Sequence, residues 1–99
     1  MPRYTGTIAV SPDPVGFGEQ AYIAYSSSHP KPWARITCYL PENGTVGMVS
    51  YVNLWAGTTS FVAGPTPSWG GAPANGVAEL LYWNGRRFVT IATDEFTVD

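Results

Sequence analysis

Cysteine is almost absent from this sequence, in which Cys38 is the single example. One thiol cannot close a disulfide within the chain, and it cannot supply the several thiolates of a cysteine-ligated zinc site. A small domain without such links depends on its apolar core, which suits a reducing compartment. We therefore expect a domain held together by packing alone.

Charge is also scarce, since only 12% of the 99 residues are charged and the net charge is −2. The five Lys and Arg are scattered except for Arg86-Arg87, so no basic stripe can neutralise the phosphates of a nucleic acid. No apolar run approaches the roughly 20 residues that span a membrane, and the first residues do not resemble a signal peptide. We expect a soluble protein made in the cytosol, without nucleic-acid or membrane partners.

Catalytic groups are few. His29 is the only histidine, and it follows Ser26, Ser27 and Ser28. Serines beside a histidine suggest a hydrolase, but no nucleophile elbow surrounds them, so a polar loop is the simpler interpretation. Cys38 falls at a position expected to face the core, where a free thiol packs as a small apolar group. The sequence predicts no catalytic residues, no cofactor and no enzymatic activity.

The carboxylates are dispersed along the chain, and Asp94-Glu95 is the one adjacent acidic pair. A calcium loop requires more oxygen ligands at fixed spacing than this pair offers, so no metal site is expected. We interpret the pair as a solvated bend in the last strand, after which Phe96 and Val98 return to the core.

Glycine and proline are abundant, with 11 and 9 residues, although 44% of the chain is hydrophobic. This composition is too apolar for disorder and too interrupted for long helices. Runs of β-branched and aromatic residues bounded by turn residues predict the following strands. They are Tyr4–Val10, Gln20–Ser26, Ala34–Leu40, Val46–Leu54, Ser60–Ala63, Val77–Trp83 and Arg86–Val98.

This pattern predicts one all-β domain over residues 1–99, an immunoglobulin-like β-sandwich of about seven antiparallel strands. A small barrel is the alternative. Asn43-Gly44 is expected to form a tight turn after the third strand. The segment 56–76 is too rich in Gly, Pro, Ser and Thr for a long ladder, and we expect it to cross from one sheet to the other.

Asn84-Gly85 predicts a two-residue hairpin turn. In that register Trp83 opposes Arg86 and Leu81 opposes Phe88. Every second residue then shares a face, which sorts the apolar side chains of the hairpin into an inner and an outer set.

Glu79 decides which face is the outer one, because burying an unpaired carboxylate is costly. Leu81, Trp83 and Phe88 lie on its face, whereas the inner set includes Ala78 and Leu80. On the third strand Arg35 and Tyr39 are expected to point outward, and Ile36, Cys38 and Leu40 are expected to point toward the core. The resulting patch is either a docking surface or a region that the 56–76 connector covers, with Trp69 hiding Trp83 or Phe88. The candidate interface residues are Tyr39, Leu81, Trp83, Arg86, Phe88 and Trp69.

Several segments resemble a family of small immunoglobulin-like domains in actinobacterial phages. They are GPTPSW from Gly64, AELLYWNGRRFVTIAT from Ala78, EFTV from Glu95 and, on the central strand, WARITCY from Trp33. The resemblance extends from about Thr7 to Val98. In similar sequences the central-strand cysteine can face a second cysteine just before the AEL segment, where this chain has Asn75-Gly76 instead.

The resemblance implies a virion accessory protein that decorates a capsid or a tail, without enzymatic activity or cofactor. Its partner would be the major capsid protein or another virion protein, and it would be made in the cytoplasm of the bacterial host. The sequence does not choose between capsid and tail. Self-association through the patch or through an unprotected edge strand is a further option.

A carbohydrate-binding module is the alternative function, with host surface glycans as the ligand. It is suggested by the four tryptophans, Trp33, Trp55, Trp69 and Trp83, since sugars stack on exposed aromatic faces. The opposing interpretation is that most of these tryptophans pack in the core.

Overall fold

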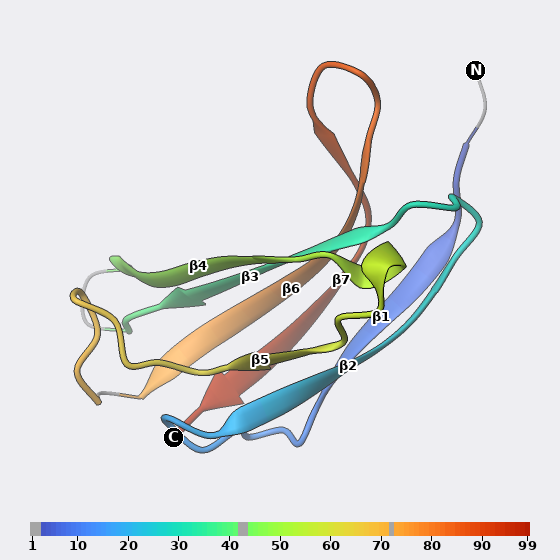
Figure 1. Cartoon of the computed structure of the whole chain (residues 1–99). Helices are drawn as coiled ribbons and strands as arrows, with labels where there is room; N and C mark the ends of the chain where they lie inside the picture. Colours follow the sequence, from blue (N-terminus) through green and yellow to red (C-terminus); the bar gives the residue numbers. More distant parts are fainter. Residues whose placement is uncertain (1–2, 42–43, 72) are drawn as a thin grey trace.

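The computed structural model describes residues 3–41, 44–71 and 73–99, which form an all-β domain (Figure 1). The strands in these ranges are β1 (Gly6–Ser11), β2 (Gln20–Ser27), β3 (Trp33–Tyr39), β4 (Val46–Val52), β5 (Ser60–Val62), β6 (Ala74–Trp83) and β7 (Phe88–Val98). A short 3-10 helix, η1 (Leu54–Ala56), follows β4. All the predicted strands are confirmed, with only small shifts at their ends.

The strands form two antiparallel sheets that pack against each other. One sheet has the order β1-β2-β5, and the other has the order β4-β3-β6-β7. Figure 1 shows the two layers, with β2 and β5 in one and β3, β4 and β6 in the other. The prediction of a β-sandwich is confirmed, and the two separate sheets rule out the small barrel.

The segment 56–76 crosses between the sheets, as predicted. Its strand β5 pairs with β2, whereas the next strand, β6, pairs with β3 and β7. Hydrogen bonds beside β5 extend this short pairing: the Ile23 N–H donates to Thr59 O over 2.8 Å, and the Ala63 N–H donates to Glu19 O over 3.0 Å. The chain therefore crosses twice, and β5 fixes the point where it turns back.

Side chains that point between the sheets form one apolar core. Ile36 and Cys38 of β3 and Ala78 and Leu80 of β6 are fully buried in it, and Leu40 packs against it partly exposed. Because successive residues of a strand face opposite sides, this alternation also fixes which side chains of β3 and β6 face outward. The inward positions predicted for these five residues are confirmed.

The predicted two-residue hairpin turn is wrong. Trp83 pairs with Phe88, so four residues form the turn. Asn84 closes it: its N–H donates to Arg87 O over 3.1 Å, and its side-chain Oδ1 accepts the N–H groups of Arg86 and Arg87, each over 2.9 Å. An asparagine that bonds to the backbone two and three residues ahead stabilises this wider turn.

A β-bulge further along the hairpin shifts the register again. Leu81 pairs with Thr90 while Leu80 pairs with Ala92, which leaves Ile91 as the extra residue of β7. The predicted pairs of the hairpin are therefore wrong along its length. A register predicted from the turn residues alone could not include the bulge, because the bulge depends on how β7 curves over the sandwich.

The bend predicted at Asp94-Glu95 is also wrong, because β7 runs without interruption through both residues. Asp94 does not turn to solvent: its Oδ2 accepts the N–H of Val10 on β1 over 3.0 Å. This bond joins the two sheets along one open side of the sandwich and satisfies a donor on an edge strand. The expected return of Phe96 and Val98 to the core is confirmed.

The predicted Asn43-Gly44 turn lies partly outside the described residues, which do not include position 43. Gly44 has φ of +68°, and its N–H donates to Leu40 O over 2.9 Å. Glycine adopts this left-handed conformation without the steric cost that a Cβ would bring.

Candidate functional site

The outer face of the four-stranded sheet carries part of the predicted patch. Trp83 is 51% exposed, Arg86 is exposed at the tip of the β6–β7 hairpin, and Phe88 is half-buried. The rings of Trp83 and Phe88 pack edge to face with centroids 5.2 Å apart. These three predicted residues lie together at one end of the sandwich.

Leu81 was expected to be exposed, but it is fully buried. It lies on the outer face with Glu79, outside the core cluster between the sheets, and its neighbour on β3 is Trp33. The rings of Trp33 and Trp83 both pack against Phe88. The prediction is wrong because this group of rings covers the sheet where Leu81 stands.

Tyr39 is exposed and on the outer face, as expected, but it does not lie beside the other aromatic residues. In the β3–β6 ladder Trp33 is the neighbour of Leu81, whereas Tyr39 pairs with Asn75 at the opposite end of the strand. Six residues at about 3.3 Å each separate the two positions. Tyr39 is therefore not part of the same surface.

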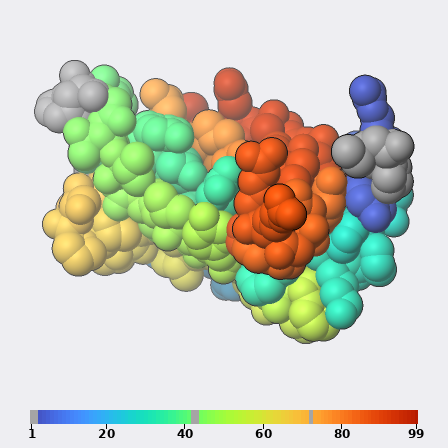
Figure 2. All heavy atoms as spheres, turned by 90° about the horizontal axis from the view of Figure 1, so that it is seen from above, coloured from blue at the N-terminus to red at the C-terminus, as the bar shows by residue number. Residues whose placement is uncertain are grey.

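Trp69 is buried in the core at 1% exposure and does not cover the patch. Its ring packs edge to face against Phe17, with centroids 4.9 Å apart, and its Cβ lies against Gly47 of β4. In Figure 2 the gold connector that contains Trp69 lies at the opposite end of the molecule from the orange hairpin. The proposed covering of Trp83 or Phe88 by Trp69 is therefore wrong.

Two further tryptophans join Trp83 and Phe88 around a cavity of about 390 Å³. We call this cavity the ring cleft, and the residues that line it are His29, Lys31, Trp33, Trp55, Trp83 and Phe88. They come from the loop before β3, from β3 itself, from η1 and from both strands of the hairpin. Figure 2 shows the orange hairpin rising beside the cyan segment before β3 and the yellow-green η1.

Trp55 is held at the cleft by the bonds that anchor η1. Its backbone N–H donates to Pro32 O over 3.1 Å, and the hydroxyl of Tyr25 donates to Leu54 O over 3.3 Å. The Asn53 side chain accepts the Ala56 N–H over 3.3 Å and so caps the short helix. Trp55 is thereby fixed while its side chain stays 47% exposed.

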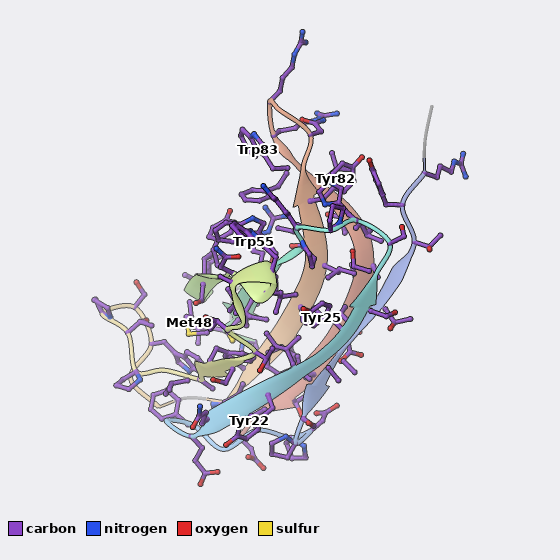
Figure 3. All side chains as sticks on the ribbon, turned by 45° about the vertical axis from the view of Figure 1, so that its right-hand side comes forward. Tyr22, Tyr25, Met48, Trp55, Tyr82 and Trp83 are labelled. Carbon is purple, nitrogen blue, oxygen red and sulfur yellow. The ribbon has the colours of Figure 1, made fainter. Side chains whose placement is uncertain are left out.

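Phe88 is the centre of the ring packing. Its centroid lies 5.8 Å from Trp33, 5.6 Å from Tyr51 and 5.2 Å from Trp83. Edge-to-face and offset-stacked rings at these distances each add about 0.5–1.5 kcal/mol beyond area burial. Figure 3 shows Trp83 and Trp55 on one side of the hairpin and Tyr82 on the other. The rings of the cleft are therefore held in place by their packing on Phe88.

His29 is a structural residue of the cleft wall and is not paired with a serine. Its Nδ1 accepts the Lys31 N–H over 3.1 Å, and its ring stacks on Tyr82 with centroids 4.9 Å apart. Tyr4 packs edge to face against the same ring over 4.7 Å. The Ser27 hydroxyl bonds with the backbone of His29, donating to its carbonyl over 3.0 Å. This geometry agrees with the interpretation of His29 and the neighbouring serines as a polar loop.

An ion pair supports the sheet next to the cleft. Arg35 of β3 donates from Nε to Glu79 Oε1 over 2.8 Å and from its terminal nitrogen to Oε2 over 2.9 Å. The Thr90 hydroxyl donates to the same Glu79 Oε2 over 3.0 Å. The hydrogen bonds from Arg35 hold the pKa of Glu79 below its ordinary value against the opposing effect of burial, and those to Glu79 raise the pKa of Arg35. The carboxylate faces outward as predicted, and it is paired.

This pair predicts a pH-dependent contribution to stability. Because folding lowers the pKa of Glu79, its contribution is present above the unfolded-state pKa of about 4.3 and is lost as pH falls through the folded-state value. Glu79→Gln is therefore expected to reduce the free energy of unfolding at pH 7 and to change it much less at about pH 3. Chemical denaturation at both pH values measures the difference.

Arg35→Gln provides the matching control, since it removes the donor and leaves the carboxylate in place. The difference in free energy of unfolding between wild type and this variant should also become smaller at acidic pH. If Glu79→Gln lowered the free energy of unfolding by the same amount at neutral and at acidic pH, the stabilising role of the Arg35–Glu79 ion pair would be contradicted.

Other chemically active groups offer little at this site. Burial raises the pKa of the Cys38 thiol to about 11, so it remains protonated and packs in the core. Among the described residues no group of three or more His, Cys, Asp or Glu is placed to hold a metal ion. No helix formed by the described residues is long and apolar enough to cross a membrane. The cleft thus offers aromatic rings and one ammonium, that of Lys31.

The predicted interface set did not include four residues of the cleft, His29, Lys31, Trp33 and Trp55, although both tryptophans were among those considered for sugar stacking. Trp33 had a readable signal, because it lies two residues before Arg35 and so shares its outward face. Trp55 had none, since its position depends on the turn of η1 after β4. Three of the four tryptophans line the cleft, and Trp69 lies in the core.

The fold and the cleft together define a small all-β sandwich with an aromatic cleft at one end. Comparison of the chain with family models, with curated proteins and with solved structures found no match.

Proposed function

We propose that this protein is a non-enzymatic accessory protein of a phage virion, a decoration protein that docks on the capsid or tail surface. The observation that carries the binding part is the ring cleft, which three tryptophans from separate elements line together. Exposed Trp and Arg side chains around a pocket are typical of the residues that dominate protein interfaces. The resemblance to small phage domains supports the virion part.

The proposed immunoglobulin-like assignment has support from the strand order. Strands 1, 2 and 5 form one sheet and strands 3, 6 and 7 form the other, as strands A, B, E and C, F, G do in immunoglobulin domains. The fourth strand differs from the constant-domain arrangement because it pairs with the third. This change widens the sheet whose outer face carries the cleft.

The absence of catalysis in this proposal rests on the surroundings of the candidate groups. His29 is stacked on Tyr82 and bonded to the Lys31 backbone, and Cys38 is fully buried. Neither group faces an acid, base or nucleophile in a catalytic arrangement among the described side chains.

Co-sedimentation with phage particles tests the virion role. Particles purified on a gradient from a host that expresses the tagged protein should contain it at stoichiometric abundance, as measured by mass spectrometry. Trp83→Ala should reduce the bound amount at least about fivefold, because truncating an interface anchor costs more than about 1 kcal/mol. Tyr22→Ala is the matched control, since Tyr22 is 54% exposed on the other sheet.

Particles without the protein would contradict the virion role itself. Particles that retain Trp83→Ala at the wild-type level would assign docking to a face other than the cleft. Sedimentation of the free protein measures self-association. The oligomeric state of Trp83→Ala is compared with that of Tyr22→Ala.

A carbohydrate-binding module is the second candidate, and one observation favours it. Trp33, Trp55 and Trp83 line a single cleft, and the side chains of Trp55 and Trp83 are about half exposed. Concave sites lined by aromatic rings with few polar groups are typical of small-ligand binding. Both roles are compatible if the virion uses the domain to hold glycans of the host surface.

A further inference from the structure

The charged side chains of this protein are distributed very unevenly. All five Lys and Arg lie toward the end of the sandwich that carries the ring cleft: Arg3 before β1, Lys31 before β3, Arg35 near the start of β3, and Arg86 and Arg87 at the hairpin tip. Among the described residues the ion pair is that of Arg35 with Glu79. The other four cations are exposed and make no ion pair with a described carboxylate.

The opposite end of the sandwich is acidic. Asp13 accepts the Thr97 N–H over 3.1 Å near the end of β7, and Asp99 bonds with Val15 beside it. Asp13 and Glu95 line the same hollow. The molecule is about 41 Å long, so its net charge of −2 conceals a basic end and an acidic end. Such a charge distribution orients the basic end toward an anionic partner.

The cations flank the rings of the cleft. The Lys31 Nζ lies 5.2 Å from the centroid of the Trp55 ring, and Arg86 and Arg87 lie between Trp83 and Phe88 in the hairpin. Arg3 and Arg87 line a second hollow on the Tyr82 side, and Tyr82 stacks on His29 of the cleft wall. A ligand in the cleft therefore meets aromatic rings and the Lys31 ammonium, and a chain that extends past the hairpin reaches the arginines outside the cleft.

We infer that the ring cleft binds an acidic carbohydrate chain, with sugar rings stacked on the indoles and sugar carboxylates taken by Lys31 and the hairpin arginines. This inference rests on the second candidate of the proposed function and names its ligand. A sugar acid combines an apolar ring face with a charged edge, which matches open indoles beside cations. The cavity of about 390 Å³ accommodates a short stretch of such a chain.

Two other anionic polymers fit less well. Single-stranded nucleic acid requires a positive groove that follows its phosphates, whereas the cleft itself is lined by one cation, Lys31, on a chain of net negative charge. An acidic peptide that adds to a sheet needs a free strand edge, whereas the cleft lies over the face and the end of the sheet. Both polymers serve as competing ligands in the test.

The experiment is calorimetric titration of the full chain with short oligomers of galacturonate, mannuronate and glucuronate, each compared with its neutral methyl ester. At least one acidic oligomer should bind, and its ester should bind at least about fivefold more weakly. Added salt should weaken binding of the acid and leave that of the ester nearly unchanged.

Two kinds of variant separate stacking from charge. Trp83→Ala should weaken binding of the acid and of the ester alike, whereas Arg86→Gln with Arg87→Gln should weaken binding of the acid alone. Trp55→Ala is the second stacking variant, in case the hairpin depends on Trp83, and Tyr22→Ala should bind as wild type. Circular dichroism establishes that each variant is folded.

Several results would overturn the inference: no binding of any acidic oligomer at millimolar concentration, equal binding of acid and ester, or tighter binding of oligothymidylate or an acidic peptide. Its failure is distinct from failure of the virion role, which co-sedimentation measures separately. Particles that lose Trp83→Ala while no sugar binds would assign the cleft to docking on the virion.

Discussion

Trp69→Ala is expected to lower the free energy of unfolding by about 3–5 kcal/mol, the usual cost of truncating a fully buried large aromatic side chain. Trp69 is 1% exposed and packs against Phe17 on one side and Gly47 on the other. It belongs to the connector after β5, which has little regular structure of its own. The ring therefore anchors this segment to the sandwich, and a domain of this size has a total stability of only about 5–15 kcal/mol.

Urea unfolding followed by circular dichroism measures this effect. Trp55→Ala is the matched control because it makes the same truncation at a side chain that is 47% exposed. It should cost less than about 1 kcal/mol, as is usual for surface positions. Equal losses in the two variants would contradict the assignment of Trp69 to the core.

Gly76→Ala should be the second most damaging of the proposed changes, with an expected loss of about 1–3 kcal/mol from overpacking. A Cβ at position 76 would stand 2.2 Å from Cζ of Phe96, its neighbour on β7. Phe96 is 3% exposed and packs near Phe61, with centroids 5.9 Å apart, so the ring cannot move aside without disturbing the core. The glycine is thus required by close packing.

Gly70→Ala is the control for this change, since a Cβ at position 70 would meet no atom within 4 Å. Its effect should stay within about 0.5 kcal/mol. The double variant Gly76→Ala, Phe96→Leu should lose less stability than the sum of its single changes, because the smaller side chain makes room for the methyl group. Strict additivity in this cycle would be evidence against the contact.

The position of Gly76 also affects the surroundings of Cys38. Gly76 pairs directly with Cys38 in the β3–β6 ladder. In this chain the space that a side chain would take at position 76 is filled by Phe96. An aromatic ring packed over a glycine thus takes the place of a side chain beside Cys38.

The strands could be predicted from the sequence because their signals are local. Alternation placed Ile36 and Cys38 inward and Arg35 and Glu79 outward, and the structure agrees. Pairing within the hairpin could not be predicted in the same way. The side chain of Asn84 widened the turn and a bulge at Ile91 moved the ladder, so every predicted partner shifted.

The candidate site was predicted only in part. Trp83, Arg86 and Phe88 lie where an exposed interface was expected, but Leu81 lies under the rings, Tyr39 lies at the other end of β3, and Trp69 is in the core. The four tryptophans have the same chemistry, and alternation indicates the outward face of Trp33 but not whether other segments cover it. Burial depends on which segments pack over a residue, and those segments are distant in sequence.

By itself the sequence determined the all-β class, the strands and the inward and outward sides of the central ones, because side chains alternate along a strand and turn residues interrupt it. The tertiary structure alone decided that Trp33, Trp55 and Trp83 meet around one cleft and that the cations gather at that end. These residues are brought together by the crossing of the chain between two sheets and by the register of β3 against β6. Both arise from long-range packing, which no short stretch of sequence encodes.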